Sequence, residues 1–313
     1  MKNKGIFYSI VTLLFLVPLI LYATTYLDIT SAQLEYKKTK ITGEKLSAYV
    51  ESINSDLPRA LEIIGKQSVA AAIAQIDYSG TPLDDANNRI IEVMMNGTIY
   101  SRPTNLTNST LPSWVNAAIF KGVRYGFETN ITIKNLSVNA YDSFHVLLRA
   151  TIIVNSTESS RTMRLDKTYN EDLVLSIEGF EDTIYTLNTN GLLTRTIKKA
   201  NITVSGATAV DTAVAQKLYM SSNDGPSFLD RLEGRLSTSS KYSSQTPNII
   251  GLETLIYLPE ISYVGVPIKT SQSVIDHYYF GSSAHAGSLV EDSSYDWLRL
   301  DASHAAFYGV TLV

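Results

Sequence analysis

The residues from Ile6 to Ala23 constrain this chain more than any other feature, because they form an uncharged, mainly apolar run of eighteen residues. No charged side chain follows until Asp28. As a helix, the stretch from Ile6 to Leu27 would extend about 33 Å, which matches the hydrocarbon thickness of a bilayer. The run therefore predicts a transmembrane helix at the N-terminus.

The residues that flank this run predict its orientation. Lys2 and Lys4 precede it, and basic residues next to a span favour the cytoplasmic side. We therefore expect everything from about residue 28 onward to lie outside the cell. A cleaved signal would require small residues at its cleavage site, and Leu21 to Thr25 lacks that pattern. We predict an uncleaved single-span anchor, with a cleaved signal and a buried core helix as alternatives.

The first residues resemble the leader of archaeal type IV pilin-like proteins. The resemblance rests on the short basic segment Met1–Gly5 followed by Ile6 and a long apolar helix. It implies that a prepilin peptidase cuts between Gly5 and Ile6, with Lys4, Gly5 and Ile6 as the processing residues. Pilins usually carry a Glu at the fifth position after the cut, where this chain has Ile10. That departure favours a minor pilin-like protein over a major filament subunit.

A longer resemblance is to a group of uncharacterised archaeal membrane-anchored surface proteins. It rests on three segments, Val50–Leu61, Asp172–Asp182 and Tyr295–His304, and covers most of the chain. It implies a location at the cell surface and brings no known activity with it.

Composition excludes several classes of function. The chain has no cysteine, which excludes disulfides, thiolate metal sites and cysteine nucleophiles. Its formal net charge is −4, and no basic stripe follows Lys45, so we expect no nucleic-acid partner. We also expect no cofactor. The expected partners are the lipid bilayer and other proteins, which the stalk and the sheet domain would contact in a pilus-like or homo-oligomeric assembly.

Seven Asn-x-Ser/Thr sequons lie on the predicted outer side of the membrane, and they identify possible N-glycosylation sites of a surface glycoprotein. A chain rich in Ser, Thr and Asn also forms such sequons by chance. The seven are Asn96, Asn105, Asn108, Asn130, Asn135, Asn155 and Asn201.

Residues 28–77 carry a helical pattern and predict a stalk that continues the transmembrane helix. Apolar residues recur every three, four or seven positions from Leu27 to Ile76, which places one apolar seam along the helix. Gly43 and Pro58 predict segmentation, with a new helix starting at Asp56. Two interpretations remain open: the stalk pairs with a partner helix, or it lies against its own globular domain.

The remaining residues predict an α+β fold, with an antiparallel sheet packed against short helices. The chain divides into an anchor with a short basic leader (1–27), the stalk (28–77), an α+β domain (78–205) and an irregular α/β region (206–313). The last region is either a second domain or an elaboration of the first. Thr81 and Pro82 predict the start of a helix that Gly97 ends. The segments 127–133, 144–154, 161–169 and 172–178 predict four or more strands, with the preceding helices covering one face.

No segment carries a catalytic signature, so we predict no catalytic residue and no metal site. Four histidines occur, and His145 lies within a predicted strand. The other three gather with acidic residues near the C-terminus, where imidazole and carboxylate would suit Zn²⁺ or Mn²⁺, but their spacing matches no ligand motif. The pairs Asp84–Asp85, Glu181–Asp182 and Glu291–Asp292 predict solvated carboxylates. The C-terminal group is Asp276, His277, His285, Asp292, Asp296, Asp301 and His304.

These patterns together predict a non-enzymatic membrane-anchored surface protein. The most specific function that these patterns predict is that of a minor pilin-like protein or a subunit of a cell-surface assembly. A ligand-binding or sensor ectodomain is the main alternative, although only about five residues would remain inside the cell for output. A surface hydrolase that uses the C-terminal Asp and His residues is a further alternative.

Overall fold

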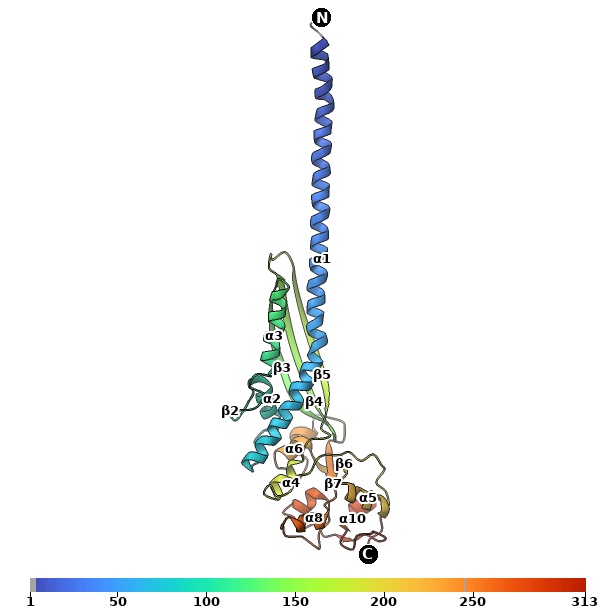
Figure 1. Cartoon of the computed structure of the whole chain (residues 1–313). Helices are drawn as coiled ribbons and strands as arrows, with labels where there is room; N and C mark the ends of the chain where they lie inside the picture. Colours follow the sequence, from blue (N-terminus) through green and yellow to red (C-terminus); the bar gives the residue numbers. More distant parts are fainter. Residues whose placement is uncertain (1–3, 245) are drawn as a thin grey trace.

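Helix α1 (Lys4–Ser79) dominates the molecule, as Figure 1 shows. The computed structural model describes residues 4–244 and 246–313, with side chains from Tyr8 onward. The predicted division of the stalk is wrong, because Gly43 and Pro58 both lie inside this one helix. Pro58 removes one backbone donor, and the helix axis turns where it lies along the sheet (Figure 1). Packing of this part of the helix outweighs the local cost of Pro58, whereas Gly43 lies before the buried part and costs only about 1 kcal/mol relative to Ala.

The first half of α1 projects from the body, and the second half belongs to its core. Side chains from Tyr8 to Lys45 are mostly exposed, including Leu27, Leu34 and Ile41. From Leu46 onward the predicted seam is buried against the protein's own sheet and helices. Of the two interpretations of the stalk, the one in which the helix lies against its own globular domain is therefore correct for residues 46–76. The buried seam consists of Leu46, Val50, Ile53, Leu57, Leu61, Ile64 and Ile76.

The main sheet has three antiparallel strands in the order β3 (Phe127–Asp142), β4 (His145–Glu158) and β5 (Arg164–Ser176). The predicted fourth strand is absent from this sheet in the described residues, because the two segments predicted around a turn at Tyr169–Glu171 form one strand. Tyr169 pairs with Ile152 and Glu171 pairs with Ala150, so the ladder continues through the expected turn. That stretch has no Gly or Pro, and side chains that fit the ladder let β5 continue.

Helices α1, α2 and α3 cover one face of the sheet, as predicted. Helix α3 (Leu111–Arg124) is capped by Thr110, and α2 (Ala86–Asn96) ends at Gly97 with φ 67°. The predicted start of α2 is wrong, since Thr81 and Pro82 lie before it and Asp85 is the cap. The connection between these helices holds two short strands, β1 (Thr98–Ile99) and β2 (Arg102–Pro103).

The C-terminal third packs short elements around a second core at the end of the molecule opposite the N-terminus (Figure 1). With small antiparallel sheets and short helices after α1, the fold is α+β as predicted. Strands β6 (Tyr219–Ser227) and β7 (Gly251–Thr254) pair antiparallel. The elements are α4 (Thr183–Asn188), α5 (Ala207–Gln216), β6 (Tyr219–Ser227), α6 (Phe228–Leu232), α7 (Ser240–Ser243), β7 (Gly251–Thr254), α8 (Leu258–Tyr263), α9 (Asp276–Phe280), β8 (Ser288–Leu289), β9 (Arg299–Leu300) and α10 (Ala302–Phe307).

Candidate functional site

Glu253, His277 and His304 form a buried cluster of titratable side chains in the C-terminal third. One donor atom from each residue lies within 4.8 Å of the donor atoms of the other two. Glu253 comes from β7, His277 from α9 and His304 from α10. The three residues are only 1%, 2% and 4% exposed. Three separate elements therefore bring two imidazoles and a carboxylate together away from solvent.

His304 lies between two carboxylates. Its Nδ1 is 2.8 Å from Asp301 Oδ2, and its Nε2 is 3.3 Å from Glu253 Oε2. Burial alone would lower the pKa of His304, but the hydrogen bonds to Asp301 and Glu253 outweigh burial and raise the pKa to about 10. Asp301 also caps α10 by accepting hydrogen bonds from the backbone of Ser303 and His304. Tyr308 donates its hydroxyl proton to the other oxygen of Glu253.

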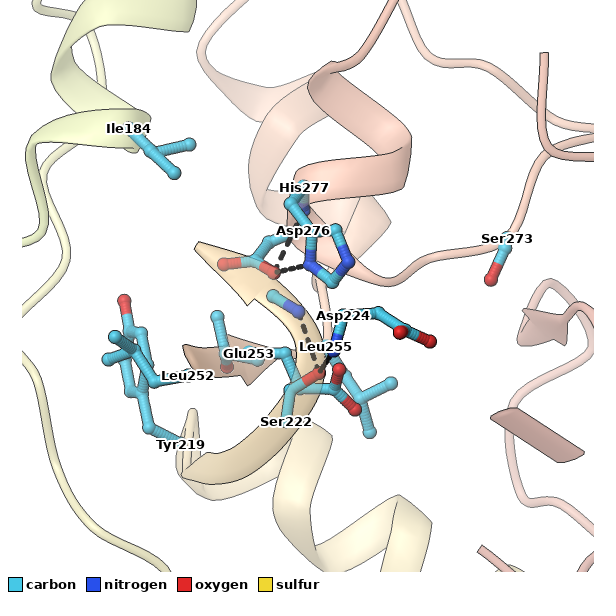
Figure 2. A network of polar contacts seen from close by, with 12 residues as sticks. Ile184, Tyr219, Ser222, Asp224, Leu252, Glu253, Leu255, Ser273, Asp276 and His277 are labelled. Carbon is cyan, nitrogen blue, oxygen red and sulfur yellow. Dashed lines mark hydrogen bonds and ion pairs between the residues drawn. The ribbon is translucent and has the colours of Figure 1, made fainter. Parts of the chain in front are cut away.

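His277 has a partner on one ring nitrogen only. Its Nδ1 lies 3.3 Å from Asp276 Oδ1, and its Nε2 has no hydrogen-bond partner among the described residues. Figure 2 shows Asp276 and His277 at the start of α9, close to the strands that carry Ser222, Asp224 and Glu253. The unpartnered nitrogen is thus buried beside the other two members of the cluster.

A buried ion-pair network holds Asp276 in place. Arg231 Nη1 lies 2.7 Å from Asp276 Oδ2 and 2.7 Å from Asp182 Oδ2, and all three side chains are fully buried. Burial would raise the pKa of Asp276, but Arg231 and His277 keep it below its ordinary value. Arg231 also donates to the carbonyl of Leu252, the residue before Glu253. The network therefore joins α6, α9 and β7 around the cluster.

Two hollows adjoin the cluster on either side of Asn223 and Asp224. One, of about 160 Å³, is lined by Glu253 and His304 together with Ser222, Asn223, Asp224, Ser303 and Phe307. The other, of about 600 Å³, is lined by His277 together with Tyr278, His285, Asn223 and Asp224 among others. Each hollow therefore borders at least one residue of the buried cluster.

The structure brings together part of the predicted C-terminal group. His277 and His304 meet, and Asp276 and Asp301 each contact one of them. His285 stays outside the donor cluster and stacks on Tyr278 with ring centroids 3.8 Å apart. The loop residues Asp292 and Asp296 are exposed and belong to no donor group.

Sequence reasoning missed Glu253 and misjudged Asp182. Glu253 is the single charged residue in the apolar stretch from Ile249 to Leu258, and that isolation is the signal that could have identified it. Asp182 was predicted to be solvated, but it is fully buried and paired with Arg231. Its partner lies 49 residues away, at a distance that local sequence patterns do not reach. His145 lies in β4 beside Asp142 on the sheet, with Nδ1 2.8 Å from Oδ1.

The predicted modification sites lie elsewhere. Six of the seven sequon asparagines are exposed, whereas Asn155 is half-buried in the central strand β4 and donates to Asp166 Oδ1 at 2.7 Å. Lys4, Gly5 and Ile6 form the start of α1, and the leader residues 1–3 lie outside the described part of the chain. Use of the sequons and cleavage of the leader remain predictions.

A third hollow, of about 520 Å³, lies between α1 and the segment that follows α2. Ala70, Ala71 and Ala74 of α1 line one side of it, and the segment from Ile99 to Ser109 lines the other. The small alanine side chains border this hollow. Its lining offers Arg102 as the only charged group and carries no acid–base pair.

No protein-family model, curated protein or solved structure matches this chain. The functional interpretation therefore depends on the geometry of α1 and of the C-terminal cluster.

Proposed function

We propose that the protein is a single-pass membrane protein whose body lies outside the cell, and that it acts as a non-enzymatic surface protein. The minor pilin-like or cell-surface assembly subunit is the most specific form of this proposal. The observation that carries it is the free apolar end of α1. An 18-residue window there has a mean hydropathy of 2.1, and none of it is buried by the rest of the protein. A core helix of a soluble protein would be covered.

The polar side chains of this segment support a membrane location. The hydroxyl groups of Thr12, Thr24 and Thr25 donate to backbone carbonyls one turn earlier in the same helix, at 2.7 Å, 3.1 Å and 2.7 Å. Side-chain hydroxyls that are satisfied within the helix do not need water, which is the requirement for a segment inside a bilayer. A single unbroken helix across Leu21–Thr25 also presents no extended site for a signal peptidase.

The position of the body supports an outward-facing surface role. The exposed helix from Asp28 to Leu46 extends about 27 Å, and this length would separate the body from the membrane surface. Leu27, Leu34 and Ile41 remain exposed at intervals of seven residues on this segment. A partner helix, from a second copy or from a pilus-like assembly, would cover them. The six exposed sequon asparagines are compatible with an extracellular face.

Membrane extraction and protease access test this proposal together. In native membranes, the full chain should stay in the pellet after carbonate washing, and protease added to intact cells should digest the body. A chain that starts at residue 28 should be soluble after the same treatment and serves as the control. Release of the full chain by carbonate, or protection of the body in intact cells, would contradict the proposal.

Mass spectrometry of the native protein distinguishes its two specific forms. A chain that begins at Ile6 supports pilin-like processing, and substitution Gly5→Leu should then leave the leader in place. A chain that retains Met1 supports a plain anchor and excludes the pilin-like form. The same spectrum reports glycans on the sequon asparagines.

A further inference from the structure

We propose that Glu253, His277 and His304 bind one divalent transition-metal ion of the Zn²⁺ class. This inference goes beyond the proposed surface role and does not depend on it. Two imidazole nitrogens and one carboxylate oxygen are ligands that Zn²⁺ and its neighbours accept, whereas Ca²⁺ and Mg²⁺ prefer oxygen alone. The three donor atoms already lie within 4.8 Å of one another. An ion between them would replace the one 3.3 Å contact between His304 Nε2 and Glu253 Oε2.

The unpartnered nitrogen of His277 is the observation that points to a ligand. His277 is 2% exposed, and its Nε2 has no hydrogen-bond partner among the described residues. Leaving a buried polar atom unsatisfied costs about 1–3 kcal/mol. Because Asp276 occupies the Nδ1 side, Nε2 is the nitrogen that remains for an ion. A metal ion would satisfy it.

The carboxylates behind both histidines match the surroundings of metal-bound imidazoles. Asp276 Oδ1 lies 3.3 Å from His277 Nδ1, and Asp301 Oδ2 lies 2.8 Å from His304 Nδ1. Metal-ligating histidines commonly donate their other N–H to a carboxylate, which holds the ring in the correct tautomer and orientation. Arg231 holds Asp276 from the other side, and Ser273 donates to Asp301 Oδ2 at 2.9 Å.

The charge around the cluster favours a cation. Glu253, Asp276, Asp301 and Asp182 contribute four carboxylates, against the Arg231 guanidinium and the extra proton of His304. An ion bound through Nε2 of His304 would displace the proton between that nitrogen and Glu253. A dication between Glu253 and the two histidines would offset this excess of negative charge in a region where water provides little screening.

The adjoining hollows leave room for a fourth ligand. Glu253 and His304 line the first hollow, His277 lines the second, and the exposed Asp224 lines both. A site with three protein ligands and one solvent-facing position is the arrangement in which Zn²⁺ keeps a bound water or small molecule.

Cobalt titration of the full chain in detergent tests the site. After removal of bound metal with a chelator, Co²⁺ should bind with one equivalent and a dissociation constant of about 1 µM or tighter. It should give visible absorption bands typical of nitrogen and oxygen ligands, and Zn²⁺ should displace it. His277→Ala and Glu253→Gln should each weaken binding about 100-fold or more, and Asp301→Asn about 10-fold or more. His145→Gln removes a histidine that also pairs with an aspartate and should leave binding unchanged.

Two results would overturn the proposal. One is a folded wild-type protein that takes up no Co²⁺ or Zn²⁺ at about 100 µM. The other is a folded His277→Ala variant that binds as tightly as the wild type. If the variants do not fold, X-ray absorption at the zinc edge of the loaded wild type tests the site instead. The spectrum should show two imidazole ligands, and a spectrum without them would contradict the proposal. Each readout uses purified protein, so its failure is distinct from a failure of membrane anchoring.

Discussion

At the scale of single residues, buried charged groups connect parts of the chain that are distant in sequence. Glu233, whose side chain is 2% exposed, accepts hydrogen bonds from the Ala86 backbone at 2.9 Å, Tyr242 at 2.6 Å and Lys241 at 2.7 Å. Burial would raise the pKa of Glu233, but these donors outweigh it and keep the pKa below its ordinary value of 4.5. One carboxylate thus joins the end of α6, the start of α2 and helix α7.

Replacing this carboxylate should destabilise the protein in a pH-dependent way. We expect Glu233→Gln to lower the free energy of unfolding by about 1–3 kcal/mol at pH 7. Because the folded-state pKa is lowered, the ionised group stabilises the fold above the unfolded pKa, and this contribution disappears as pH falls below about 4. Urea unfolding of both proteins from pH 7 to pH 3 measures the difference. A difference that stays constant over this range would contradict the assignment.

At the scale of elements, the close approach of α3 to α1 depends on a glycine. A Cβ atom on Gly122 would lie 2.4 Å from the hydroxyl oxygen of Tyr49 and 2.8 Å from its ring carbon Cζ. Tyr49 is buried and donates to the carbonyl of Ala118 at 3.0 Å, which holds its ring in this place. Gly43 in α1 differs, since the nearest atom to an added Cβ there is Cε of Met163 at 3.4 Å.

The same substitution should therefore have opposite effects in the two helices. Gly122→Ala should destabilise the protein by about 1–3 kcal/mol, because the methyl group overlaps a rigid buried ring. Gly43→Ala should raise stability by up to about 1 kcal/mol, because alanine is the better helix former and nothing must move. Thermal unfolding of both variants beside the wild type measures this. Equal effects at the two positions would show that α3 does not contact α1 as closely as described.

At the scale of the whole molecule, one helix serves both as the proposed anchor and as part of the core. Its N-terminal part contributes no buried residue from Tyr8 to Lys45. From Leu46 to Ile76 it contributes buried apolar side chains that pack against β4, β5, α2 and α3. The proposed anchor and the core are therefore joined by one continuous helix, Lys4–Ser79.

Truncation should separate these two roles. A chain of residues 28–313 should fold and unfold cooperatively near the midpoint of the full chain, because all buried residues remain. A chain of residues 78–313 should fail to fold, since loss of the α1 seam exposes the face of the sheet to water. Circular dichroism and size-exclusion chromatography report both outcomes. A compact, cooperatively unfolding 78–313 fragment would show that the helix is dispensable for the core.

Elements with strong local signals could be predicted from the sequence. The apolar seam from Leu46 to Ile76 and the stop at Gly97 depend on neighbouring residues. The start of α2, the continuous strand β5 and the unbroken α1 could not be predicted, because tertiary packing outweighed the local preferences there.

The candidate site could be predicted only in part. The sequence placed His277, His304, Asp276 and Asp301 in one group, but it offered no reason to add Glu253 or to exclude His285.

The sequence alone determined that an uncharged apolar helix begins this chain and continues into a helix with one apolar seam. Composition and spacing within a single segment are sufficient for that, because hydrophobicity and helical period are local properties. The tertiary structure alone decided that the seam faces the chain's own sheet and that Glu253, His277 and His304 meet. These residues lie up to 51 positions apart, and their contact depends on how β7, α9 and α10 pack together.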